Sequence, residues 1–109
     1  MTVYLGGIAG TPVSLTDVAK EKGLMVAKVR YSFQGLKKLT GYVLVDSDRN
    51  EIVEIEPSFS KSYKWSAVIH ERGGGMIRGN FKTMSSLVSA LKKYDIGSYR
   101  TGFKFTGKI

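Results

Sequence analysis

The fold of this chain is decided by residues 40–56, which have the sequence TGYVLVDSDRNEIVEIE. Two runs rich in branched apolar residues, Thr40–Asp46 and Glu51–Glu56, flank the polar stretch Ser47–Asn50. β-Branched residues favour strands, whereas serine, aspartate and asparagine favour turns because their side chains bond to nearby backbone groups. The pattern therefore predicts two antiparallel strands joined by a four-residue hairpin loop.

Segments on both sides of this hairpin also have the pattern of strands. In Met25–Phe33 the odd-numbered positions are apolar, which places Lys28 and Arg30 on the opposite face. Further strands are predicted at Val3–Leu5, Tyr63–Glu71, Met76–Lys82 and Tyr99–Phe105.

Two segments have the apolar spacing of an amphipathic helix. In Ser14–Gly23, the residues Leu15, Val18 and Ala19 share one face, and the glycine suits the helix end. In Thr83–Tyr94 the apolar stripe is longer, and two lysines lie in the last turn, where the helix dipole favours cations. The stripe consists of Met84, Leu87, Val88, Leu91 and Tyr94.

Because the strands outnumber the helices and follow one another through hairpin-length links, the sequence predicts an α+β fold. We expect residues 1–109 to form a single small basic domain. Its mainly antiparallel sheet would have about five to six strands, with one or two helices packed on one face.

Composition excludes several classes of protein. The chain has no cysteine, which removes disulfide scaffolds, thiolate metal sites and cysteine nucleophiles. The amino-terminal residues lack the positive region of a signal peptide, and no apolar run reaches the length of about 18 residues that spans a membrane. We therefore expect a soluble, cytoplasmic protein without a membrane partner.

Charge is distributed unevenly along the chain. Residues 57–109 contain ten lysines and arginines and two acids, so this half alone carries the net charge of the whole protein, +8. Residues 46–56 contain five acids against Arg49. A surface this basic attracts polyanions, and nucleic acid is the first partner that we expect.

Three basic segments supply candidate contacts to nucleic acid. As a strand, the run Phe59–Trp65 would place Phe59, Lys61, Tyr63 and Trp65 on one face. It would then combine rings for base stacking with lysines for phosphates, provided that the rings are not part of the core. Between Arg72 and Lys82, glycines would let the backbone approach a phosphate. The alternative is a flexible hairpin tip, which is compatible with this role because it would carry two arginines. The predicted last strand has three cations on one face, with Lys28 and Arg30 as candidate neighbours. The candidate residues are Lys61, Tyr63, Lys64, Trp65, Arg72, Arg78, Lys82, Arg100, Lys104 and Lys108.

No motif indicates catalysis, a metal or a cofactor. The stretch from Asp46 imitates the start of a calcium loop, but Glu51 stands where that loop needs glycine and Pro57 where it needs the closing glutamate. His70 is the one histidine, and no nucleophile is spaced to pair with it. We therefore expect a protein that is not an enzyme.

The sequence thus favours a nucleic-acid-binding protein of low sequence specificity, with single-stranded DNA or RNA preferred over duplex DNA. The alternative is a small interaction or inhibitor module, of a kind common among viral proteins, which docks its basic face on an acidic protein. A third hypothesis is a homo-oligomer, in which the acidic residues 46–56 of one copy face the basic residues 57–109 of the next copy.

Overall fold

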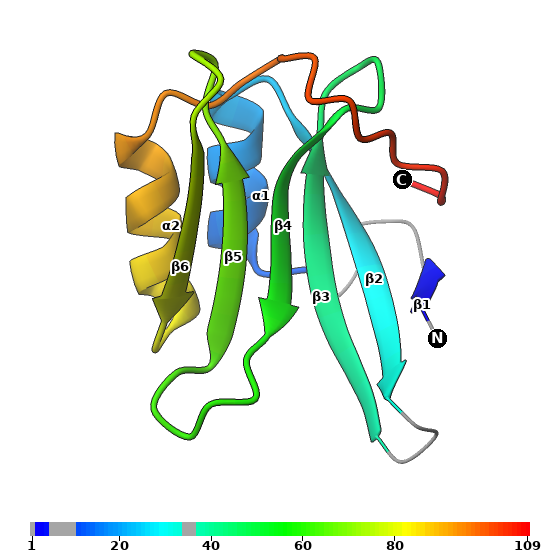
Figure 1. Cartoon of the computed structure of the whole chain (residues 1–109), viewed down its shortest axis with the longest axis vertical. Helices are drawn as coiled ribbons and strands as arrows, with labels where there is room; N and C mark the ends of the chain where they lie inside the picture. Colours follow the sequence, from blue (N-terminus) through cyan, green and yellow to red (C-terminus); the bar gives the residue numbers. More distant parts are fainter. Residues whose placement is uncertain (1, 5–10, 34–36) are drawn as a thin grey trace.

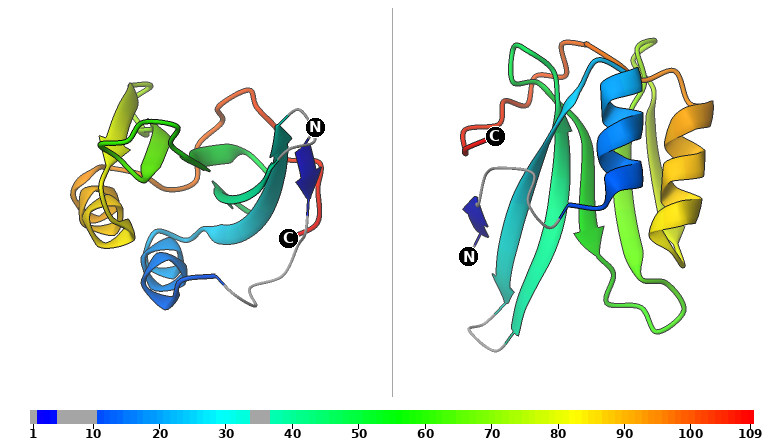
Figure 2. Two further views of the ribbon diagram at one scale, coloured as in Figure 1. Left: turned by 90° about the horizontal axis from the view of Figure 1, so that it is seen from below. Right: turned by 180° about the vertical axis from the view of Figure 1, so that it is seen from behind.

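The computed structural model describes residues 2–4, 11–33 and 37–109, and the side chains of residues 11–30 and 39–109. The elements, in chain order, are β1 (Thr2–Tyr4), α1 (Val13–Glu21), β2 (Met25–Phe33), β3 (Lys37–Val45), β4 (Glu51–Pro57), β5 (Trp65–His70), β6 (Met76–Phe81) and α2 (Met84–Lys93). The strands form one antiparallel sheet in the order β1-β2-β3-β4-β5-β6. Both helices lie on the same face of this sheet (Figure 1, Figure 2). The predicted α+β fold is therefore confirmed.

The predicted helix over Ser14–Gly23 corresponds to α1. Leu15, Val18 and Ala19 are buried, as the apolar spacing predicts. The helix is followed by Gly23, whose φ of +72° lies in the left-handed region that glycine enters without strain. Neither α1 nor α2 has the length and apolar content to cross a membrane, and this holds for the described part of the chain.

The second helix, α2, begins at a capping box. The Thr83 hydroxyl oxygen accepts a hydrogen bond from the Ser86 amide at 3.1 Å, and the Ser86 hydroxyl oxygen accepts one from the Thr83 amide at 3.4 Å. These bonds satisfy backbone donors that the first turn of a helix leaves free. Leu87, Val88 and Leu91 are buried against the sheet and α1, so α2 matches the predicted segment closely.

The main core lies between the helices and the sheet. It is built mainly from alternate residues of the central strands, together with the apolar stripes of both helices. The neighbours Ile52 and Val53 both belong to it, near the register shift between β3 and β4. The strand residues of this core are Val26, Tyr42, Leu44, Ile52, Val53, Ile55, Ala67 and Ile69.

A second, smaller core lies on the opposite face of β2 and β3. Ala27 and Val29 pack there with Val43, Val45 and Phe105, the last being only 2% exposed. The strand β2 is therefore buried on both faces, by the helices on one side and on the other by residues 94–109, which we call the carboxyl-terminal segment.

This arrangement corrects the prediction that Lys28 and Arg30 neighbour the basic residues of the carboxyl-terminal segment. Lys28 lies opposite Tyr42 in the β2–β3 register, so both lysine and tyrosine belong to the face that carries the helices. The carboxyl-terminal segment covers the other face. The side chains of Tyr31 and Phe33, and residue Leu5 of the predicted first strand, lie outside the described residues.

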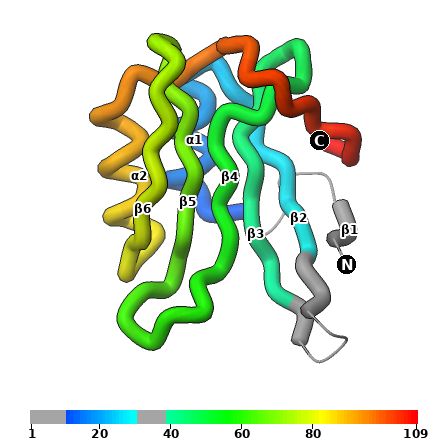
Figure 3. The backbone as a smooth tube through the Cα atoms, in the orientation of Figure 1, coloured from blue at the N-terminus to red at the C-terminus, as the bar shows by residue number. Residues whose placement is uncertain are grey.

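The strand predicted over Tyr99–Phe105 is wrong. After α2 the chain is irregular and crosses the end of the β3–β4 hairpin toward β2 (Figure 3). Among the described residues, its one contact of strand type is a bridge between Asn50 and Lys104. Gly102 interrupts the extended conformation with a φ of +86°. The segment cannot join the middle of the sheet, because β3 and β5 already pair with both edges of β4.

Candidate nucleic-acid interface

Residues 58–64 form a loop rather than the start of a strand. The Ser60 amide donates to the Ser58 hydroxyl oxygen at 3.1 Å, and the Ser62 amide donates to the Ser60 hydroxyl oxygen at 3.2 Å. Such local bonds compete with the hydrogen bonds of a strand and turn the chain. The prediction that Phe59, Lys61, Tyr63 and Trp65 share one strand face is therefore wrong, and β5 begins at Trp65.

The loop is tied to the end of β6. The Ser58 amide donates to the Lys64 carbonyl at 2.9 Å, which closes the loop, and the Lys64 amide donates to the Phe81 carbonyl at 3.0 Å. Because Lys82 follows Phe81 directly, this second bond brings it beside Lys64 from a distant part of the sequence.

We call this part of the surface the basic aromatic end, and its residues are Phe59, Lys61, Tyr63, Lys64 and Lys82. All five side chains are exposed; Phe59 exposes 75% of its surface and Tyr63 exposes 39%. Neither residues 57–64 nor residues 81–86 contain an acid. The basic aromatic end therefore combines three lysines with two rings accessible to solvent.

Trp65 has a different environment from these two rings. It is half-buried against the main core, with its ring centroid 6.0 Å from that of Tyr42. The Lys64 ammonium lies 6.0 Å from the Trp65 ring centroid, within the range of a cation–π contact. Trp65 thus supports the loop by packing, while Phe59 and Tyr63 offer the more open rings.

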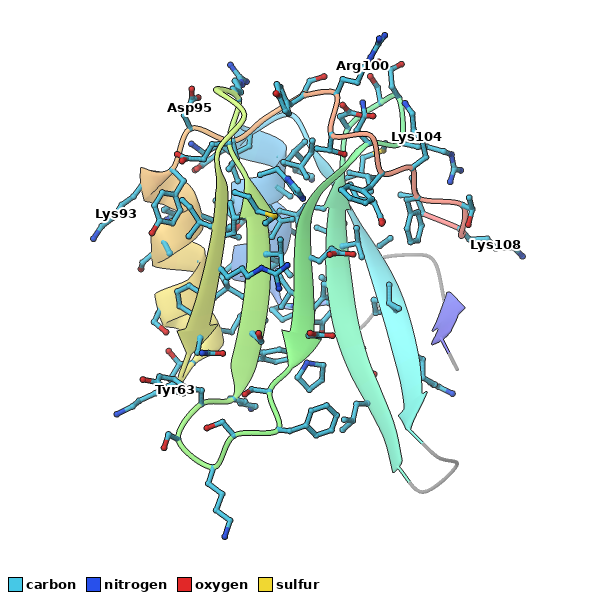
Figure 4. The ribbon with its side chains drawn as sticks, viewed as in Figure 1. Tyr63, Lys93, Asp95, Arg100, Lys104 and Lys108 are labelled. Carbon is cyan, nitrogen blue, oxygen red and sulfur yellow. The ribbon has the colours of Figure 1, made fainter. Side chains whose placement is uncertain are left out.

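A second group of candidates lies at the opposite end of the long axis, which measures 38 Å. Figure 4 shows Arg100 and Lys104 toward that end and Lys108 closer to mid-height at the right edge, all three far from Tyr63. Because 38 Å is several Debye lengths at physiological salt, the two ends act as separate charged surfaces. The Lys104 ammonium donates to the Asp48 carbonyl at 2.9 Å, so this lysine also fastens the carboxyl-terminal segment to the β3–β4 turn.

The two arginines near the glycine loop are not brought together. Arg72 lies at the tip of the β5–β6 hairpin, where its amide donates to the Asp95 carbonyl at 3.0 Å. Its guanidinium Nε is 3.9 Å from the Asp95 carboxylate, and a Cβ on Gly97 would overlap the guanidinium group. Arg72 therefore holds the hairpin against the segment after α2. The loop does not place Arg72 and Arg78 together on one binding surface.

Arg78 lies on the sheet face away from the helices, next to acidic residues. A hollow of about 280 Å³ on this face is lined by Glu51, Glu54, Glu56, Val68, His70, Met76, Arg78 and Phe103. Burial and the neighbouring carboxylate of Glu54 raise the pKa of Glu51. The surroundings of Arg78 are therefore much more acidic than those of Lys61, Lys64 and Lys82.

The polar turn after β3 is occupied by an internal network. Asp46 is 1% exposed; its carboxylate accepts hydrogen bonds from the Asp48 and Asn50 amides at 2.9 Å and from the Asn50 side chain at 2.8 Å. Ser98 also donates to it at 3.2 Å. Burial by itself would raise the pKa of Asp46, but the hydrogen bonds outweigh it and the pKa is lowered.

Among the described side chains, no three acids or histidines are grouped so that they could hold a metal ion.

The sequence analysis named Phe59 in the aromatic run but did not include it among the candidate contact residues, although it is the most exposed aromatic residue of the basic aromatic end. The sequence contains a signal for this loop, because Pro57 followed by alternating serines is typical of a loop.

No protein-family model matches this chain, and comparisons with curated proteins and with solved structures gave no match either.

Proposed function

We propose that this protein binds single-stranded nucleic acid, with little sequence preference and without catalysing a reaction, through the basic aromatic end. The observation that carries the proposal is the combination of three lysines and two exposed rings on one loop and the adjoining strand end. Cations that follow the phosphates and rings that stack on bases are the two components by which proteins hold single strands.

The two components have different energetic roles. Each base stacked on an aromatic ring contributes about 1–3 kcal/mol, and this depends little on the identity of the base. Each lysine that neutralises a phosphate releases a counterion, which makes the affinity depend on salt. Lysine, tyrosine and phenylalanine do not form the bidentate contacts to base edges that read sequence, so low specificity is expected.

Single strands are favoured over duplexes because the bases of a duplex are already stacked on each other. Phe59 and Tyr63 would then find no free base face, and only the lysines would contribute. The rings therefore predict tighter binding to an unpaired oligonucleotide than to the same sequence in a duplex.

The proposal is tested with two variants that have the same net charge. One variant replaces Lys61, Lys64 and Lys82 by glutamine; the control replaces Lys93, Arg100 and Lys108, which are exposed elsewhere (Figure 4). Fluorescence anisotropy with a labelled 12-nucleotide single strand, as DNA and as RNA, measures the dissociation constant. We expect the first variant to lose at least about tenfold in affinity and the control to lose less than about threefold.

Tyr63→Phe and Tyr63→Ala separate stacking from charge. The phenylalanine variant keeps the ring and should bind normally, whereas the alanine variant should lose about fivefold or more. Equal losses in the two triple variants, or tighter binding of duplex than of single strand, would contradict the proposal.

A further inference from the structure

The strand β6 is an open edge of the sheet. Within the part of the chain that the structure describes, it pairs only with β5, in a regular register of six residue pairs from Trp65↔Phe81 to His70↔Met76. The Glu71 amide donates to the Gly75 carbonyl at 2.8 Å, which extends the same register by one pair. Residues Gly75, Ile77, Gly79 and Phe81 therefore direct their backbone groups toward β5.

Because backbone groups alternate in direction along an antiparallel strand, those of Met76, Arg78 and Asn80 point away from β5, toward the edge. None of the loop and cap hydrogen bonds within the described residues involves these three. All three residues are exposed, and α2 lies behind β6 on the helix face (Figure 2). The edge thus presents three donors and three acceptors in the spacing of a β-ladder.

Natural edge strands are usually protected by proline, a bulge, charge or a covering element. The strand β6 has no proline and no bulge, and its protection is the charge of Arg78, with Arg72 before the strand and Lys82 after it. This charge disfavours a second copy of the chain, because two β6 strands side by side would place cations opposite cations. A segment of opposite charge meets no such cost.

We propose that β6 accepts an extended acidic segment of a partner protein as a seventh strand. The partner would supply backbone groups for the three edge residues and a carboxylate opposite Arg78. The added strand would lie three strand spacings, about 14 Å, from the glutamates of β4, which is beyond the Debye length at physiological salt. Repulsion from Glu54 and Glu56 is therefore screened, whereas attraction to Arg78 is direct.

The edge is separate from the basic aromatic end in its chemistry, because strand addition requires peptide N–H and C=O groups that a nucleic acid does not have. This inference consequently does not depend on nucleic-acid binding. It identifies a second surface, and its partner class is an acidic protein segment.

A synthetic peptide tests the proposal. The probe is a capped, fluorescently labelled eight-residue peptide in which glutamate alternates with valine. Two further peptides carry N-methyl groups, one on all glutamates and the other on all valines. Only every second backbone amide of the added strand points toward β6 and bonds to it. N-methylation should therefore weaken binding at least about tenfold in one peptide and leave the other nearly unchanged.

If N-methylation of the glutamates weakens binding, the seventh strand is antiparallel to β6. If N-methylation of the valines weakens binding, the seventh strand is parallel to β6. Either result supports the proposal. In the same complex, hydrogen–deuterium exchange should slow at Met76, Arg78 and Asn80. Arg78→Glu should weaken binding by about tenfold or more, while the control Arg100→Glu, with the same change in net charge, should have little effect.

Four results of the peptide experiments would overturn the proposal. These are no measurable binding of the peptide, equal weakening by both N-methylated peptides, exchange protection elsewhere than β6, and equal binding of a peptide in which lysine replaces glutamate. Self-association of the protein that buries β6 would also overturn it, because the occupant would then be a second copy.

Discussion

Replacing Phe105 by alanine should be the most damaging single change in the carboxyl-terminal segment. The ring is 2% exposed and fills the second core against Ala27, Val29, Val43 and Val45. Truncating a buried phenylalanine to alanine costs about 3–5 kcal/mol, through lost burial and the cavity that remains. A domain of this size has a total stability of roughly 5–15 kcal/mol, so the loss removes a large share.

Urea unfolding followed by tryptophan fluorescence and circular dichroism measures this loss directly. At an unfolding entropy of about 2.1 cal/mol/K per residue, a loss of about 4 kcal/mol lowers the melting temperature by roughly 17 °C. The matched control is Phe103→Ala, because Phe103 lies two positions away and is 61% exposed. It should cost under about 1 kcal/mol. Equal effects of the two substitutions would refute the second core.

Three further changes test other parts of the account. Asp46→Asn should destabilise the protein by about 2–3 kcal/mol at neutral pH. Because folding lowers the pKa of Asp46, its contribution is present above the unfolded pKa of about 3.9 and disappears as the pH falls through the folded value; urea midpoints should therefore converge with wild type below about pH 4. Thr83→Ala should cost about 1 kcal/mol in thermal melts, whereas Thr83→Ser should cost little. Glu51→Gln should raise the urea midpoint at pH 7, since folding raises the pKa of Glu51 and so disfavours its charged form; an unchanged midpoint would contradict this.

Local patterns predicted most of the fold. The strand β2 has the predicted bounds, and both helices begin and end within two residues of the predicted segments. These elements bury residues at the spacing of their own backbone, so the sequence of each segment contains the information. The strand β2 also buries Val26 on its second face, which simple alternation did not indicate.

Two segments were predicted wrongly for physical reasons. Tyr99–Phe105 alternates like a strand, but a strand needs a free partner, and the order of the sheet leaves none at that position. That order is a property of the whole chain and cannot be deduced from seven residues. Residues 58–64 also alternate, yet the serine hydroxyls bond to the backbone and turn it.

The candidate site was predicted in part. Its lysines and aromatic rings were identified as residue types, but their grouping depends on long-range pairing. The β5–β6 register places Trp65 opposite Phe81, and the Lys64 amide donates a hydrogen bond to the Phe81 carbonyl. This bond joins Lys82 to the loop and leaves Arg78 and Arg100 in other regions. Which rings are exposed and which are packed also depends on where β5 begins. Trp65 is the first residue of β5 and is half-buried, whereas Tyr63 lies in the loop before it and is exposed.

The salt dependence of binding to a single-stranded oligonucleotide tests the central claim most directly. At about 0.7 counterions per phosphate, three lysine contacts give a slope of about −2 for the logarithm of the binding constant against the logarithm of salt concentration. We predict this slope for the wild type and for the variant lacking Lys93, Arg100 and Lys108. The slope should approach zero when Lys61, Lys64 and Lys82 are replaced. A slope that survives that replacement, or a wild-type affinity indifferent to salt, would contradict binding through the basic aromatic end.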